Sequence, residues 1–87
     1  MYYVYVLRSE TNHSFYVGFT QSIKRRLYEH KAGKNASTKM RGPFELIYFE
    51  GFVNKFDALR REGYMKIAKG RAMLKGILRE YLDKMPE

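Results

Sequence analysis

The chain has 87 residues, of which 45% are hydrophobic and 30% charged, and it contains no cysteine. This size and balance predict one domain spanning residues 1–87, and they exclude a disordered chain, a disulfide-stapled fold and thiolate chemistry. Seventeen Lys and Arg residues against nine Asp and Glu residues give a net charge of +8. That charge favours a polyanionic partner, most simply nucleic acid, over a solubilising coat or an anionic membrane surface.

Targeting and membrane segments are not expected. The chain runs from Met1 directly into a strand-like pattern, with no basic segment ahead of an apolar one, and no apolar stretch approaches the length of a membrane span. We therefore expect a cytoplasmic protein with no membrane partner.

The first part of the chain predicts a hairpin. Residues 2–7 are rich in Tyr and Val, the composition of a strand, and residues 15–19 resume this pattern after a polar turn at residues 9–14. Both faces of the first strand carry apolar or aromatic side chains, which is typical of a central strand covered on both sides.

A helix is expected to follow the hairpin. Residues 20–22 offer capping side chains, Ile23 and Leu27 begin a helical period, and Gly33 ends the helix. Residues 34–43 have no apolar pattern and predict a basic, polar loop.

Residues 44–53 predict a third strand, after which Asn54 caps a second helix. The expected inner face of this helix consists of Phe56, Leu59, Gly63 and Ile67. A break at residues 69–70 separates it from a last helix, whose expected apolar stripe consists of Leu74, Ile77, Leu78, Tyr81 and Leu82. The order strand, strand, helix, strand, helix, helix predicts an α+β fold, a small three-stranded antiparallel sheet flanked by helices.

The first helix carries two ionisable residues on its apolar side. At about 100° per residue, Arg26 and His30 lie on the arc of Ile23 and Leu27, whereas Arg25 points almost the opposite way. The helical wheel alone favours a structural explanation, in which Arg26 lays its stem along the edge of the core and His30 is a hydrogen-bonded histidine at that edge.

Three other polar groups interrupt faces that would otherwise be core. Glu62 lies on the flank of the apolar face of the second helix, where its neighbours Arg60 and Arg61 also suggest a surface ion pair. Tyr5 and Tyr16 stand on the two arms of the hairpin, where they also suit plain core rings with exposed hydroxyls.

Together these residues suit the cleavage of a phosphodiester bond. That reaction needs a metal to polarise the phosphate, a cation to stabilise the negative charge of the transition state and a base for the attacking water. Magnesium often takes only one or two protein carboxylates, and arginine matches phosphate oxygens bidentately.

Two segments on the hairpin, YVY at residues 3–5 and YVG at residues 16–18, resemble the paired motif that names the GIY-YIG nuclease family. Further family positions follow in order, with Arg26 and His30 in KRRLYEH and Glu62 in ALRREGYMK. The resemblance covers nearly the whole chain and points to the small, stand-alone bacterial members that consist of the nuclease domain and little else.

The resemblance implies a role for each of these residues. Tyr5 and Tyr16 would position or activate the attacking water, Arg26 would stabilise the phosphate, His30 would serve as a base or proton relay, and Glu62 would bind Mg²⁺ or Mn²⁺. Two departures are conservative, with Tyr3-Val4 where the family has a glycine and Val17 where it has isoleucine. A third is larger, because no asparagine follows Asn54, whereas some larger members carry one late in the domain.

Three functions are compatible with the sequence. The first is a metal-dependent endonuclease acting on DNA rather than RNA, structure-selective or dependent on a protein partner. The second is a module that binds nucleic acid on the same basic face without cutting it, and the third is an interaction protein whose charge serves only for solvation. The expected backbone contacts come from Arg25, Lys34, Lys39 and Arg41.

Overall fold

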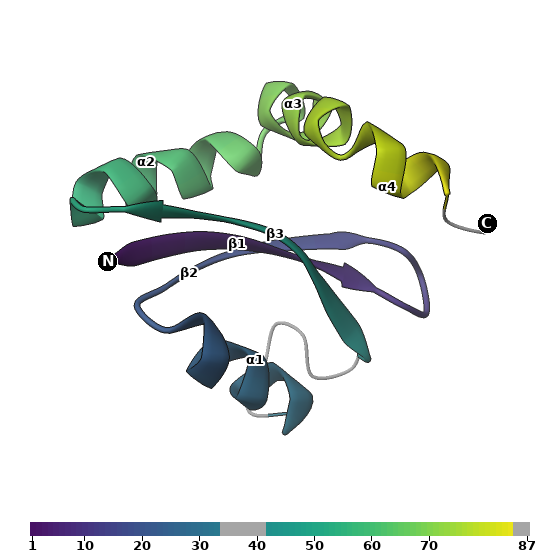
Figure 1. Cartoon of the computed structure of the whole chain (residues 1–87), viewed down its shortest axis with the longest axis horizontal. Helices are drawn as coiled ribbons and strands as arrows, with labels where there is room; N and C mark the ends of the chain where they lie inside the picture. The colour runs from purple at the N-terminus through teal and green to yellow at the C-terminus, as the bar shows by residue number, and fades with distance from the viewer. Residues whose placement is uncertain (34–41, 85–87) are drawn as a thin grey trace.

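A three-stranded antiparallel sheet organises the chain, as seen in a computed structural model that describes residues 1–33 and 42–84 (Figure 1). Its strands are β1 (Tyr2–Ser9), β2 (Phe15–Thr20) and β3 (Phe44–Phe52), in the spatial order β2-β1-β3. The central strand β1 pairs with β2 on one side and with β3 on the other, so the predicted hairpin and α+β fold are confirmed.

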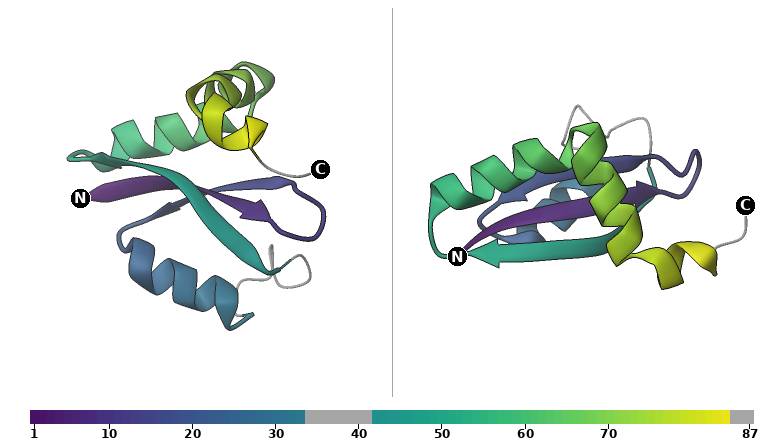
Figure 2. Two further views of the ribbon diagram at one scale, coloured as in Figure 1. Left: turned by 45° about the vertical axis from the view of Figure 1, so that its right-hand side comes forward. Right: turned by 90° about the horizontal axis from the view of Figure 1, so that it is seen from above.

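The helices cover the two faces of the sheet unequally. Helix α1 (Ile23–Lys31) lies on one face, and α2 (Lys55–Met65), α3 (Ala68–Ile77) and α4 (Arg79–Asp83) lie on the other. Seen from above, α2 runs along the sheet, α3 crosses it and β3 forms an open edge (Figure 2).

Two predicted caps begin the helices that carry the ionisable residues. The Ser22 side chain accepts a hydrogen bond from the backbone N–H of Arg25 at 3.2 Å, which starts α1. Asn54 accepts from the N–H of Phe56 at 2.8 Å, which starts α2. Each cap satisfies one of the backbone donors that the first turn of a helix leaves without an intrahelical partner.

The main core lies between the sheet and the α2–α3 side. Its buried members are Val4, Val6, Val17, Ala58, Met65 and Leu74. Successive side chains of a strand point to opposite faces. Tyr5 and Leu7, which alternate with Val4 and Val6 along β1, are therefore buried on the α1 side. Both faces of β1 are therefore covered, as predicted, and the polar site described below shares the smaller, α1-side layer.

The predicted inner face of α2 is wrong. Phe56 is 73% exposed and Ile67 is 53% exposed, whereas Ala58 and Met65 are buried against the sheet. Ala58 is rotated by about 200° from Phe56 around the helix. Its small side chain lets the helix backbone approach the sheet closely, and the larger apolar residues are left on the solvent side.

The predicted break at residues 69–70 is also misplaced, because α2 ends at Met65 and Gly70 lies inside α3. A Cβ atom on Gly70 would stand 1.9 Å from the carbonyl oxygen of Tyr64. This glycine therefore serves the close packing of α3 on the end of α2. The last predicted helix divides at Leu78 into α3 and α4, and Ile77 is exposed rather than part of an apolar stripe.

Candidate active site

The β1–β2 hairpin places two tyrosines on the α1 face of the sheet. Tyr5 lies opposite Gly18, and Tyr16 lies opposite Leu7, so the two tyrosines are diagonal neighbours on one face. Their ring centroids are 6.3 Å apart. The two tyrosines that the sequence singles out are therefore brought together by strand register alone.

The glycine of the second motif makes room for the first tyrosine. A Cβ atom on Gly18 would stand 2.4 Å from the Tyr5 ring and its hydroxyl. No side chain other than hydrogen fits there while Tyr5 keeps its place, so Gly18 allows the Tyr5 ring to lie across the backbone of β2.

His30, on the last turn of α1, packs against the two tyrosines and completes this cluster. It is 7% exposed, and its Nε2 lies 3.0 Å from the Tyr5 hydroxyl. Its ring centroid is 5.3 Å from that of Tyr16 and 6.3 Å from that of Phe44. The imidazole is thus enclosed by aromatic rings and joined to the sheet by a hydrogen bond.

Burial and charge set the protonation states of this pair. Burial raises the pKa of Tyr5 well above its ordinary value, and electrostatic repulsion with Tyr16 and Glu62 raises it further, against the opposing effect of Arg26. Burial also lowers the pKa of His30, and the Arg26 guanidinium lowers it again. At neutral pH Tyr5 therefore keeps its proton and the imidazole is neutral, so the hydroxyl can donate to Nε2 when the ring proton is on Nδ1.

Arg26 and Arg25 point in different directions, as the helical wheel predicts. Arg25 is exposed, whereas the Arg26 side chain is about one-third exposed, at 30%, with a buried Nε. This Nε lies 3.5 Å from a carboxylate oxygen of Glu29, an ion-pair distance, yet it makes no hydrogen bond within the described residues. A phosphate oxygen is the acceptor that such a guanidinium suits best.

Glu62 lies on α2, on the other side of the sheet from α1 (Figure 1). Its side chain is 20% exposed, and Oε2 accepts a hydrogen bond from Lys66 at 3.2 Å. The alternative that Glu62 forms a surface ion pair therefore holds, but its partner is Lys66 and not Arg60 or Arg61. Because Glu62 raises the pKa of Tyr5, its charge acts on the tyrosine cluster even from a different element.

The oxygen donors around Glu62 fit a magnesium ion only if one carboxylate and several waters bind it. No group of three or more His, Cys, Asp or Glu side chains suited to a metal occurs in residues 1–33 and 42–84. Glu62 Oε1 makes no hydrogen bond to any described residue, so one carboxylate oxygen remains for a cation. Mg²⁺ and Mn²⁺ prefer oxygen donors, and magnesium commonly binds through one carboxylate and several waters.

The expected backbone-binding residues divide into two groups. Arg25 is exposed on α1, whereas Lys34, Lys39 and Arg41 lie outside the described residues. The contribution of all four residues to nucleic-acid binding stays a prediction.

Sequence reasoning missed Glu29 as a partner of the site. Its carboxylate pairs with Arg26 and raises the pKa of His30 against the stronger lowering effects. Residues three apart on a helix are neighbours, so the spacing of Arg26 and Glu29 was the available signal.

Sequence reasoning also missed the partner of Arg61. Its guanidinium binds both carboxylate oxygens of Glu50 on β3, at 2.8 and 2.9 Å, and Glu50 in turn accepts from the Tyr48 hydroxyl at 2.5 Å. The pair ties α2 to β3 across eleven residues of sequence, and Arg60 pairs with Asp57, so neither arginine pairs with Glu62.

Comparison with known proteins gives a consistent result. A model of the GIY-YIG catalytic domain matches residues 1–75. The chain is 42% identical over 85 residues to a UPF0213 protein of Limosilactobacillus reuteri, covering 94% of this chain and 88% of the relative. It is 42% identical over 66 residues to a UPF0213 protein of Oceanobacillus iheyensis, covering 75% and 76%.

A solved structure matches the fold. The solution structure of a UPF0213 protein from Bacillus halodurans is 34% identical, with a TM-score of 0.56 over 88% of this chain and 85% of that one. Within the described residues, no helix is long and apolar enough to cross a membrane.

Proposed function

The chain belongs to the GIY-YIG family, and on this basis we propose that it is a metal-dependent endonuclease that hydrolyses phosphodiester bonds in DNA. The observation that carries the proposal is the hydrogen bond of 3.0 Å between the Tyr5 hydroxyl and His30 Nε2, with Tyr16 and Arg26 at the same face. A neutral imidazole and the partly buried Arg26 guanidinium can supply the base and the cation that hydrolysis of a phosphodiester needs.

Each residue has a separate role in this proposal. The Arg26 guanidinium holds a non-bridging phosphate oxygen and stabilises the charge that develops as the water oxygen forms its bond to phosphorus. His30 is neutral, so its Nε2 can take the Tyr5 hydroxyl proton, while the Tyr5 oxygen receives a proton from that water, either directly or through the Tyr16 hydroxyl, and thus stays protonated. Tyr5 is buried, so it orients His30 and passes the proton on rather than serving as the final base.

Glu62 is the residue that would hold Mg²⁺ or Mn²⁺. A bound divalent ion supplies Lewis-acid polarisation of the phosphate and stabilises the leaving oxygen. The chain's own part is to present one carboxylate oxygen from α2, whose charge acts on Tyr5, with the other oxygen fixed by Lys66.

The second candidate is a module that binds nucleic acid without cutting it. It is favoured by the lack of a group of three or more metal-ligating side chains in the described residues and by the exposed cations on α1. A domain of this size can bury only a small area on DNA, comparable to that of a single DNA-binding module. A small contact area also suits an endonuclease that selects a DNA structure or acts with a protein partner.

A cleavage assay separates the two candidates. Labelled linear, overhang, flap and junction DNAs are incubated with Mg²⁺ or Mn²⁺, with the wild type beside Glu62→Gln. Asp57→Asn is the matched control, since it also removes a paired carboxylate from α2. Cleavage by the wild type and Asp57→Asn but not by Glu62→Gln supports the endonuclease. Binding without cleavage of any of these DNAs supports the module.

A further inference from the structure

A groove of about 830 Å³ lies between α1 and the start of β3, next to the proposed active site. One wall comes from α1 and the other from β3, with Leu7 of β1 among the residues that line it. The groove contains apolar and aromatic side chains together with lysines. The catalytic roles proposed above do not explain this combination.

The charge of the groove is one-sided. Lys24 and Lys31 line the α1 wall, and no acidic residue is among the described residues that line the groove. The two lysines are two helical turns apart, about 10 Å along α1, so they can contact different phosphates of one strand. The groove therefore complements an anionic ligand of extended shape.

The apolar part of the groove favours a ligand with flat, unsaturated rings. Tyr28 lines the groove beside the two lysines and is 63% exposed, and Phe44 faces it from β3. Aromatic side chains in a positively charged groove are the features on which unpaired bases stack. In a duplex the bases stack on one another, so their faces are not available to such a groove.

His30 joins the groove to the active site. It lines the groove and also forms the hydrogen bond to Tyr5. A nucleotide in the groove would therefore lie next to His30, which belongs to both the groove and the proposed active site.

We infer that this groove binds an unpaired nucleotide adjacent to the scissile phosphate, so that the substrate is DNA with a single-stranded segment at the cleavage point. The inference rests on the proposed function, because it names the form of the DNA. A membrane surface is less suited to the groove, since its concave shape holds a single strand but not a bilayer.

Binding without metal tests the groove independently of cleavage. Affinities for a short labelled oligothymidylate and for a blunt hairpin duplex are measured by fluorescence anisotropy in EDTA. Tyr28→Ala should weaken oligonucleotide binding by about five-fold or more and duplex binding by less than about two-fold. Phe56→Ala, which removes an exposed ring on α2, is the control and should change neither.

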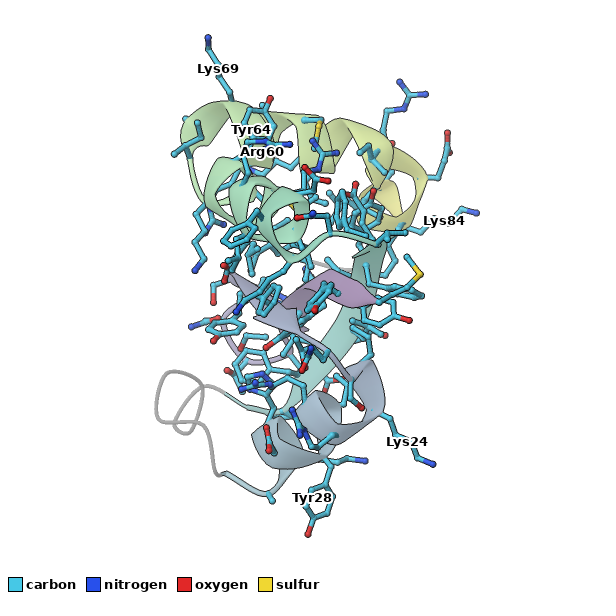
Figure 3. All side chains as sticks on the ribbon, turned by 90° about the vertical axis from the view of Figure 1, so that its left-hand side faces the viewer. Lys24, Tyr28, Arg60, Tyr64, Lys69 and Lys84 are labelled. Atoms are coloured by element: carbon cyan, nitrogen blue, oxygen red, sulfur yellow. The ribbon has the colours of Figure 1, made fainter. Side chains whose placement is uncertain are left out.

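The charged wall has its own matched control. Lys24→Ala combined with Lys31→Ala should reduce the salt slope of oligonucleotide binding by about 1.4, the value for two phosphates of a single strand. Lys69→Ala combined with Lys75→Ala removes two exposed lysines from α3 and should leave the slope unchanged. Lys24 and Tyr28 lie at the opposite end of the molecule from Lys69 (Figure 3).

Stacking can be observed directly, because the chain has no tryptophan. In Tyr28→Trp the single indole should be quenched by the oligonucleotide and not by the duplex. Equal affinity for both DNAs, equal effects of Tyr28→Ala and Phe56→Ala, or an unquenched indole would overturn the inference. So would Tyr28-dependent binding to anionic vesicles without oligonucleotide binding. Failure to cleave any DNA would overturn the proposed function but would leave these binding results intact.

Discussion

The Tyr5 hydroxyl and His30 Nε2 lie 3.0 Å apart, and both groups are held in their uncharged forms. The contact joins the middle of the central strand to the last turn of α1, across twenty-five residues of sequence. Since burial is the largest cause of both pKa shifts, the packing of α1 on the sheet sets the chemistry of the site.

The charges beside His30 should shift its titration in opposite directions. Arg26→Gln removes a cation that lowers the pKa of His30, so the pKa should rise. Glu29→Gln removes an anion that raises it, so the pKa should fall further below 6.5. The measurement is an NMR titration of the His30 ring protons in each variant. Shifts of the same sign in both variants would contradict the electrostatic assignment.

The lowered pKa of His30 also predicts how stability depends on pH. The unfolded chain binds this proton more readily than the folded one, so the contribution of His30 to stability should be full above about pH 6.5 and should be lost as the pH drops from there towards the lowered folded pKa. Urea unfolding at a series of pH values measures this. The part of the pH dependence of the unfolding free energy that comes from His30 should disappear in His30→Gln. It should persist in His13→Gln, because His13 is exposed in the hairpin turn.

Two glycines with different surroundings test the packing of Tyr5. Gly18→Ala would place a methyl group 2.4 Å from the Tyr5 ring, so it should destabilise the fold by about 1–3 kcal/mol and displace Tyr5 from His30. Gly63→Ala has no heavy atom within 4 Å of the new methyl group and lies inside α2, so it should stabilise by about 0.5–1 kcal/mol. Thermal unfolding compares them. If Gly18→Ala were as stable as Gly63→Ala, the close contact would be refuted.

Local patterns in the sequence predicted the hairpin, the caps at Ser22 and Asn54, and the opposite orientations of Arg25 and Arg26. Each depends on residues only a few positions apart, where strand alternation and helical spacing fix which side a residue faces. The grouping of Tyr5 with Tyr16 followed in the same way once the hairpin was recognised.

The errors concern contacts between distant elements. The inner face of α2 was assigned by hydrophobicity, but Ala58 lies against the sheet because a small residue allows a closer helix. Arg60 and Arg61 were considered as ion-pair partners of Glu62, but Arg61 binds Glu50 on β3 with two hydrogen bonds. Neither partner can be read from spacing along one helix, because β3 and α2 meet only in the folded chain.

The adjacent arginines should separate binding from catalysis. Arg26→Ala should reduce cleavage by about 10²-fold or more, because it removes a preorganised charge from the phosphate site, and should leave binding of DNA much less affected. Arg25→Ala removes an exposed cation and should weaken binding with little change in the rate of the bound complex. Single-turnover cleavage and anisotropy measure the two quantities. Small and equal effects of the two substitutions on cleavage and binding would show that both arginines are ordinary solvated surface residues.

Glu62 should control the response of the protein to metal. If its carboxylate binds Mg²⁺ or Mn²⁺ in the folded state only, the melting temperature should rise with metal concentration, with a stabilisation of about 2.7 kcal/mol at a hundredfold excess over Kd. Glu62→Gln keeps the shape of the side chain but removes the charge, so both this rise and cleavage should be lost. Without metal the variant should lose at most about 1 kcal/mol, because the pair with Lys66 is partly exposed.

Asp57→Asn is the control for this experiment, since it also removes a paired carboxylate from α2 and should keep both the metal response and cleavage. Thermal melts with and without metal are run for all three proteins beside the cleavage assay. If Glu62→Gln still cuts DNA, or if it melts far below the wild type without metal, then the Glu62 carboxylate has a structural role. Any metal that supports cleavage must in that case bind through other ligands than Glu62.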